Sequence, residues 1–122
     1  MKRVLLDENL PHKLRLDLHE FDTATVQYVG FAGLKNGELL REAEASGFEV
    51  FVTGDKTLEY EQNLQGRRIA VVSLSAPHWA LVEPQVGRII FAIANAIPGS
   101  FTRVDCGTFS RRRPRPSAPG PI

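Results

Sequence analysis

The chain of 122 residues has little of what several protein classes depend on. One cysteine, Cys106, excludes an internal disulfide and a zinc site built from several thiolates. The three histidines, at positions 12, 19 and 78, do not have the spacing of zinc ligands. No apolar run approaches the roughly 20 residues that span a bilayer, and the charged N-terminus is unlike a secretory signal. We therefore expect a cytoplasmic protein with no membrane partner.

Common catalytic motifs are missing as well. The chain has neither a Gly-x-x-x-x-Gly-Lys-Ser/Thr phosphate loop nor a Gly-x-Gly-x-x-Gly fingerprint, and residues 30–33 (GFAG) do not follow a strand in the required pattern. Ser73 and Ser75 lack the setting of a nucleophile elbow. These absences argue against a dinucleotide site and against a serine hydrolase.

Charge is nearly balanced in total but unevenly distributed. The formal net charge is +1, and the last 13 residues, 110–122, hold four arginines and no acid. Subtracting those four charges from +1 leaves −3 for residues 1–109. Four prolines also fall in this stretch, so we expect one domain over 1–109 and a disordered basic tail over 110–122. The tail is either a nucleic-acid arm or a dispensable terminus.

Short apolar runs alternate with helical patterns along the chain. Strands are expected at 4–6, 22–26, 50–53, 69–74 and 101–104, and helical apolar spacing runs over 10–21, 39–43 and 82–97, with a short helix or turn at 57–64. Asn9 and Asn36 look like helix caps, with Pro11 and Glu38 in the first turns that follow. Gly47 ends the second helix, and residues 98–99 (PG) end the last.

This order of elements predicts a single-domain, doubly wound α/β fold. We expect a mostly parallel sheet of about five strands, because strands that alternate with helices are joined by right-handed crossovers. The natural strand order is 2-1-3-4-5. It makes the first and third strands neighbours at the switch point, where ligands bind beyond the carboxyl ends of the strands.

Two of the predicted strands end in a carboxylate. Residues 3–6 (RVLL) run into Asp7, and residues 49–52 (EVFV) run through Thr53 and Gly54 into Asp55. If the strands are neighbours, both carboxylates lie on one rim, where they would repel each other. A hard divalent cation removes the repulsion, because Mg²⁺ and Mn²⁺ prefer oxygen ligands. The pair therefore predicts a Mg²⁺ or Mn²⁺ site.

Other polar residues near this rim have two readings each. Glu38 is either a third carboxylate over the rim or an acid that favours a helix N-terminus. Glu8 is either a ligand or a solvated surface acid, and Asn9 either caps a helix or orders a water at the cation. His12 is either a substrate contact or an exposed helix histidine. Asp7 itself can serve as ligand, nucleophile or cap.

Three stretches of the chain together match a known motif set. They are residues 4–11 (VLLDENLP), 33–40 (GLKNGELL) and 50–55 (VFVTGD). They resemble the PIN-like domain family of small prokaryotic proteins, which is related to PIN-domain ribonucleases of the VapC toxin type. The resemblance spans about residues 1–75, and its most specific part is the pair of acidic motifs in this order and at this separation.

The resemblance implies a doubly wound nuclease fold with an acidic cluster that binds Mg²⁺ or Mn²⁺ and cuts RNA. Asp7 matches the first acid of the family, and Asp55 matches the acid of its Thr-x-Asp motif, which begins here at Thr53. Two positions depart from the pattern. Asn36 stands where the family often has Asp, and Thr57 stands where a second acid is common.

We therefore expect a metal-dependent endoribonuclease, the toxin half of a toxin–antitoxin pair, with RNA as substrate and an antitoxin that covers the rim. Asp7 and Asp55 would hold the cation, with Glu38 as a direct or water-mediated ligand. The alternative is a catalytically weakened or inactive PIN-like binding or regulatory module, which Asn36 and Thr57 favour. A receiver-like phosphoacceptor is a third reading, and a homodimer stays open.

Overall fold

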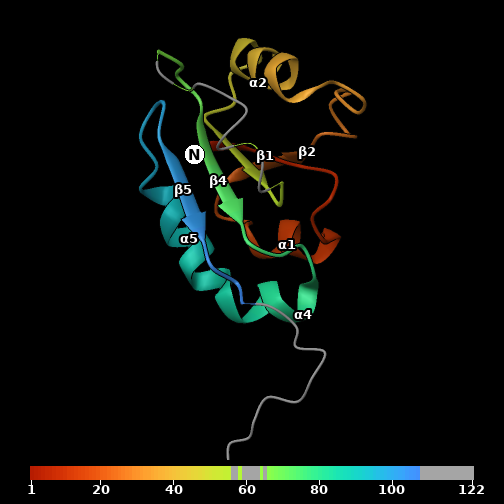
Figure 1. The fold of residues 1–122 in the computed structure, drawn as a ribbon, viewed down its shortest axis with the longest axis vertical. Helices are drawn as coiled ribbons and strands as arrows, with labels where there is room; N and C mark the ends of the chain where they lie inside the picture. The colour runs from red at the N-terminus through yellow and green to blue at the C-terminus, as the bar shows by residue number, and fades with distance from the viewer. Residues whose placement is uncertain (56–57, 59–63, 65, 108–122) are drawn as a thin grey trace, which may run out of the picture.

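The structure is a computed structural model that describes residues 1–55, 58, 64 and 66–107. Its centre is one sheet of five strands, all parallel, in the order β2-β1-β3-β4-β5 (Figure 1). The strands are β1 (Arg3–Leu6), β2 (Asp22–Thr25), β3 (Val50–Thr53), β4 (Ala70–Leu74) and β5 (Phe101–Val104). The doubly wound order predicted from the sequence is confirmed. The predicted tail over 110–122 and most of the expected helix or turn over 57–64 lie outside the described residues.

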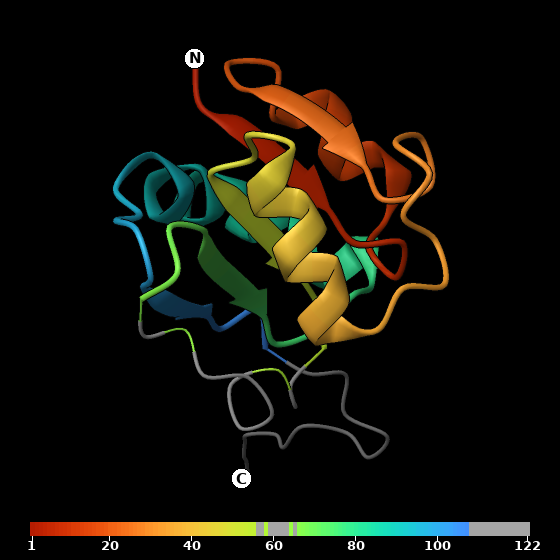
Figure 2. The ribbon, with the colours of Figure 1, turned by 90° about the horizontal axis from the view of Figure 1, so that it is seen from above.

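Helices cover both faces of the sheet. Among the described residues they are α1 (His12–Asp17), α2 (Asn36–Ala45), α4 (Trp79–Val82) and α5 (Val86–Ala94), with a 3₁₀ turn η1 (Glu83–Gln85) between the last two. Helix α2 lies on one face, and α1, α4 and α5 lie on the other (Figures 1 and 2). Within the described part of the chain, no helix is both long and apolar enough to cross a membrane.

Successive side chains of the central strands point to opposite faces of the sheet, and this divides the core into two clusters. Val4 and Leu6 join the cluster under α1 and α5, whereas Leu5 between them joins the cluster under α2. Because both faces are covered, the strands carry continuous apolar runs, as buried parallel strands do. Phe51 in β3 is fully buried. Burying a side chain of this size contributes about 1.5–3 kcal/mol to the stability of the fold. A slip of one residue would move such side chains to the other face of the sheet, so their burial fixes the register of the central strands.

The N-cap of α1 lies two residues after its predicted position, and the N-cap of α2 lies one residue before its predicted position. Helix α1 begins at His12 with Pro11 at the N-cap, and α2 begins at Asn36 with Lys35 at the N-cap; neither cap makes a side-chain hydrogen bond. The prediction that Asn9 and Asn36 cap these helices is wrong. Both side chains instead bond to the segment that follows β3, because that segment lies against them in the folded chain. Glu38 lies in the first turn of α2, as expected.

The last predicted helix, over 82–97, is in fact broken and shorter. Pro84 lies in η1 between α4 and α5, where it has no backbone N–H to continue the α-helical hydrogen bonds, and Gln85 then leaves helical geometry before α5 begins. Helix α5 ends at Ala94, where the Lys2 ammonium donates to three carbonyl oxygens of residues 93, 94 and 96. Ile97 was expected on the apolar face, but its side chain is 65% exposed.

One carboxylate ties α2 to the start of β4. The Glu44 Oε2 atom accepts hydrogen bonds from the backbone N–H groups of Arg68 and Ile69, and Oε1 lies 3.4 Å from the Arg67 guanidinium. Burial by itself raises the pKa of Glu44. The two backbone donors and the charge of Arg67 outweigh it, so the pKa of this carboxyl is held below its ordinary value.

Candidate metal site at the carboxyl edge of the sheet

The two predicted acids follow neighbouring strands. Leu6 pairs with Val52 in the register of β1 and β3, so Asp7 leaves β1 beside Thr53, the last residue of β3. The Asp7 N–H continues the ladder by donating to the carbonyl oxygen of Val52 at 2.9 Å. Asp55 follows two residues after Thr53 at the same edge. The sheet thus brings together the two acids that the sequence singled out.

A buried hydroxyl joins the two acids. Thr53 is fully buried, and its Oγ1 donates to Asp7 Oδ2 at 2.6 Å. The same oxygen accepts the backbone N–H of Asp55 at 3.0 Å. A hydroxyl offers one donor and can accept as well, so a single side chain orients the Asp7 carboxylate and positions the backbone of Asp55.

Two asparagines hold the segment after β3 from opposite sides. From the start of α2, Asn36 Nδ2 donates to Asp55 Oδ2 at 3.1 Å. From the loop after β1, Asn9 Oδ1 accepts the N–H of Gly54 at 3.3 Å. An aspartate at position 36 would face Asp55 with a like charge, whereas the amide offers a neutral donor. Both asparagines therefore stabilise the position of Asp55.

The other acids predicted near the rim are placed differently. Glu8 is exposed, and its backbone N–H donates to Asp7 Oδ1 at 2.8 Å. Glu38 is exposed and lies two helical positions after Asn36, which turns it about 200° around the axis from the side chain that reaches Asp55. Over the ranges that the structure describes, no three His, Cys, Asp or Glu side chains form a group that could hold a metal ion. Glu38 as a third ligand stays a prediction, and Thr57 lies outside the described residues.

The donor atoms present fit a hard cation better than a soft one. Asp7 and Asp55 supply carboxylate oxygens, and Mg²⁺ is commonly held by one or two carboxylates while it keeps several waters. The soft ligand of the chain, Cys106, is 4% exposed and belongs to the core cluster under α1 and α5. Burial raises the pKa of the Cys106 thiol, which disfavours the thiolate that binds metals.

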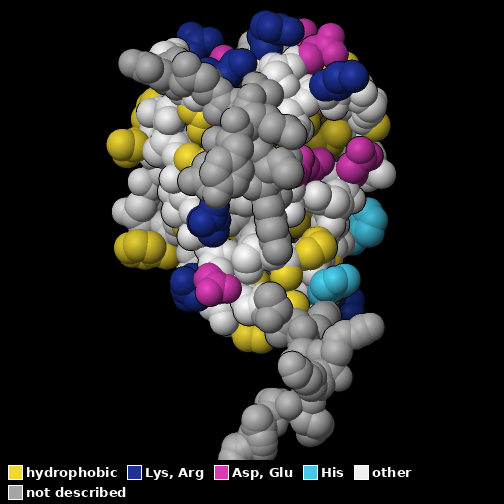
Figure 3. All heavy atoms as spheres, viewed as in Figure 1, with side chains coloured by type: hydrophobic (Ala, Val, Ile, Leu, Met, Phe, Trp, Pro, Cys, Tyr) yellow, Lys and Arg dark blue, Asp and Glu magenta, His cyan; other side chains and the backbone are white. Residues whose placement is uncertain are grey.

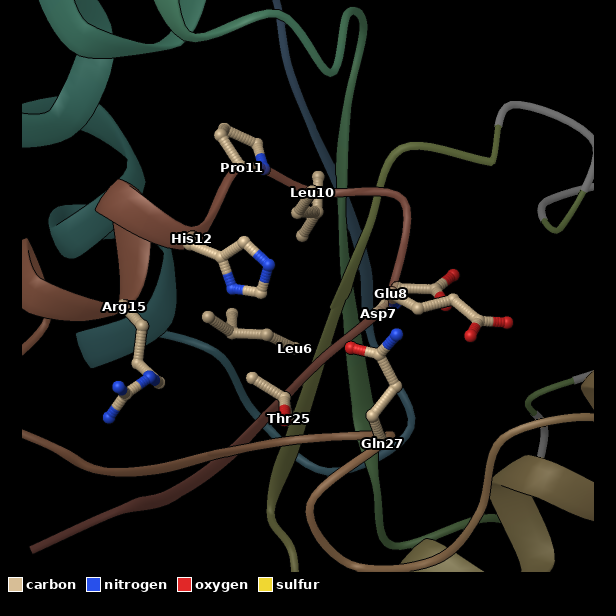
Figure 4. A pocket seen from close by; sticks show the side chains of 9 residues that line it. All are labelled: Leu6, Asp7, Glu8, Leu10, Pro11, His12, Arg15, Thr25 and Gln27. Atoms are coloured by element: carbon tan, nitrogen blue, oxygen red, sulfur yellow. The ribbon is translucent and has the colours of Figure 1, made fainter.

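A shallow hollow continues the site toward α1 and β2 (Figure 4). Its lining includes Asp7 and Glu8 on one side and the side chains of His12, Arg15 and Gln27. Acidic and histidine side chains also lie near one another along one side of the face drawn in Figure 3. Sequence reasoning weighed His12 but missed Arg15 and Gln27. The available signals were the three-residue spacing of His12 and Arg15, and the position of Gln27 just after a strand.

No family model matches the chain, and neither a curated protein nor a solved structure matches it.

Proposed function

We propose that this chain is a metal-dependent endoribonuclease and the toxin component of a toxin–antitoxin pair. The observation that supports it most is the Thr53 hydroxyl, which joins Asp7 and Asp55 at the ends of neighbouring parallel strands. Ligands of doubly wound proteins bind at this edge. Two carboxylates there can hold Mg²⁺ or Mn²⁺, and the same two residues carry the resemblance to PIN-like ribonucleases.

The side chains of this site have separable tasks in the proposed reaction. Thr53 and Asn36 orient the two carboxylates that would hold the cation. When bound, a cation of this class supplies an activated water and offsets charge that develops on the phosphate. In the hydrolysis, the water oxygen bonds to phosphorus while the phosphorus–oxygen bond of the leaving nucleotide breaks. One new end keeps the phosphate, and the other takes a proton.

The proposed partner is an antitoxin that covers this rim. The carboxylates of Asp7, Glu8 and Asp55 present negative charge at one edge of the sheet, and basic side chains of a partner would complement it. Such a partner would exclude both the cation and the RNA.

One observation favours the second candidate, a binding or regulatory module that does not cut RNA. Asp55 Oδ2 accepts a hydrogen bond from the neutral amide of Asn36, where the family pattern often has a further acid. A carboxylate satisfied by an amide has less need of a cation than one that faces a second carboxylate. Such a module would bind its partner at the same edge without metal chemistry.

Cleavage of RNA distinguishes the two candidates. We expect the purified full-length protein to cut single-stranded RNA with Mg²⁺ or Mn²⁺ but not with EDTA, and we expect Asp55→Asn to be inactive, because hydrolysis needs the activated water and the charge compensation. Asp17→Asn is the matched control, since Asp17 is exposed at the end of α1 and should leave cleavage unchanged. Absence of metal-dependent cleavage, even when Asn36→Asp is combined with Thr57→Asp, would favour the binding module.

A further inference from the structure

The turn after β2 carries Gln27 and Tyr28 and leaves the sheet beside the acidic site. Thr25 pairs with Leu6, and the Val26 N–H donates to the carbonyl oxygen of Leu6 at 2.9 Å, so this turn leaves the sheet beside Asp7. Thr25 Oγ1 accepts the N–H of Tyr28 at 3.1 Å, and the Thr25 carbonyl oxygen accepts the next N–H along the chain at 3.2 Å. These bonds hold the turn in one conformation at the edge where Asp7 lies.

Tyr28 is an aromatic side chain on this turn that the fold does not bury. It is 86% exposed, more than Phe91, the exposed aromatic of α5, at 71%. A single exposed apolar residue is ordinary on a protein surface. The position of this one is informative, because it directly follows Gln27, whose side chain lines the hollow next to Asp7. An exposed flat ring on the turn that borders the hollow is a platform on which a base can stack.

An imidazole and a guanidinium from α1 also line the hollow. His12 and Arg15 are three residues apart on α1, so they lie on the same side of the helix, and both line the hollow. In Figure 4 the carboxylates of Asp7 and Glu8 lie at one side, Arg15 lies at the other, and His12 and Gln27 lie between them. The Arg15 guanidinium can pair with phosphate oxygens through two parallel hydrogen bonds.

The size of the hollow limits what can enter it. Its volume is about 10 Å³, which is enough for about one water-sized group. A nucleobase therefore cannot be engulfed, but a phosphate oxygen can rest in the hollow while the base lies outside. Residues 1–109 carry a net charge of −3, so an RNA strand at this edge needs local cations to offset repulsion by the acids.

We propose that the hollow and the Tyr28 ring together form a binding subsite for single-stranded RNA next to the carboxylates, an inference that rests on the proposed function. Arg15 and His12 contact a backbone phosphate, and Tyr28 stacks on the base of a neighbouring nucleotide. The subsite selects single strands, because the faces of bases in a duplex are covered by their neighbours. It would position the strand so that a phosphodiester reaches Asp7 and Asp55.

Tyr28 is tested by the affinity for a fluorescein-labelled oligouridylate, measured by fluorescence anisotropy in EDTA so that no cleavage occurs. We expect Tyr28→Ala to weaken binding about tenfold, since base stacking on an aromatic residue has an effect of this order. Tyr28→Phe keeps the ring and should bind within about twofold of the wild type. Phe91→Ala removes an exposed aromatic from α5 and should leave the affinity unchanged.

Arg15 is tested by the salt dependence of the same binding. Arg15→Gln should lower the slope of the logarithm of affinity against the logarithm of salt concentration by about 0.7, the value for one phosphate contact to a single strand. Lys13→Gln is the matched control, because it removes the same charge from the same helix at a position that does not line the hollow. It should change the slope much less.

The outcomes separate this subsite from the nuclease. The subsite is overturned if the wild type does not bind the oligouridylate at low salt, if it binds a duplex RNA equally well, or if Tyr28→Ala binds as the wild type does. Equal losses for Tyr28→Ala and Phe91→Ala would also overturn it. Binding that depends on Tyr28, without any effect of Mn²⁺ on cleavage or melting, would keep the subsite and reject the nuclease. Metal-dependent cleavage by the wild type, together with wild-type binding by Tyr28→Ala, would keep the nuclease and reject the subsite.

Discussion

At the scale of single residues, Thr53 has the largest influence on the candidate site. Its hydroxyl bonds both to the Asp7 carboxylate and to the backbone N–H of Asp55. The Thr53 side chain is fully buried, so loss of its hydroxyl leaves the half-buried Asp7 carboxylate and the N–H of Asp55 without this partner. The effect should appear in both stability and metal affinity.

Thr53→Val keeps the shape of the side chain and removes only its hydrogen bonds. We expect the free energy of unfolding to fall by about 1–3 kcal/mol, the range for leaving buried polar groups unsatisfied, and we expect Mn²⁺ to bind more weakly. Denaturant titration and Mn²⁺ titration measure these two quantities. Thr53→Ser is the control, because it keeps the hydroxyl and removes only the methyl group. Its free energy of unfolding should fall by about 1 kcal/mol, and it should bind Mn²⁺ as the wild type does. Weaker Mn²⁺ binding by both variants alike would show that packing, not the hydroxyl, matters.

The residue scale is also where sequence reasoning was least complete. Asp7 and Asp55 were found because strand ends in a parallel sheet have a defined meeting place. Asn9 and Asn36 were assigned to helix caps, because asparagine favours that position locally. Their actual partners, Gly54 and Asp55, are far away in sequence, and no local pattern reports such a contact.

At the scale of elements, the strands were predictable and the helix boundaries were less so. Buried parallel strands read as continuous apolar runs, and each expected strand is present within one residue of its bounds. The break between α4 and α5 had a visible signal in Pro84, which the strong apolar spacing outweighed. The early end of α5 had no local signal, because the Lys2 ammonium that contacts its last carbonyls comes from the other end of the chain.

The link between α2 and β4 gives a prediction about pH. The folded-state pKa of Glu44 lies below its ordinary value of 4.5, so the ionised carboxylate stabilises the protein above that value, and this stabilisation is lost as the pH falls through the folded-state pKa. We expect Glu44→Gln to lower the free energy of unfolding by about 1–2 kcal/mol at neutral pH. The difference from the wild type should shrink below pH 4.5.

Denaturant titrations across this pH range measure the effect of Glu44→Gln. Glu42→Gln is the matched control, because Glu42 is exposed on the same helix and should change stability little at any pH. A difference between wild type and Glu44→Gln that stays constant from neutral to acid pH would contradict the role given to the ionised carboxylate.

At the scale of the whole molecule, the two edges of the sheet differ in what they hold. At the amino edge, Arg3 lies over the Phe48 ring at 4.4 Å and Lys2 bonds to the end of α5, so its charged groups support the fold. At the carboxyl edge, Thr53 joins Asp7 and Asp55, and Asp7 also lines the hollow that extends to α1. The strand order that creates this edge was predictable from the alternation of strands and helices. Which side chains line the hollow was not, because the path of the turn after β2 depends on its own hydrogen bonds.

The most direct test of the central claim is the effect of Mn²⁺ on the melting temperature. A cation that binds the folded state raises the melting temperature, so we expect Mn²⁺ to stabilise the wild type and the Asp17→Asn control, and EDTA to reverse the shift. Asp7→Asn and Asp55→Asn should each keep the fold and lose the shift. A shift of the same size in the Asp7→Asn/Asp55→Asn double variant would contradict the account, because the ion would then bind elsewhere.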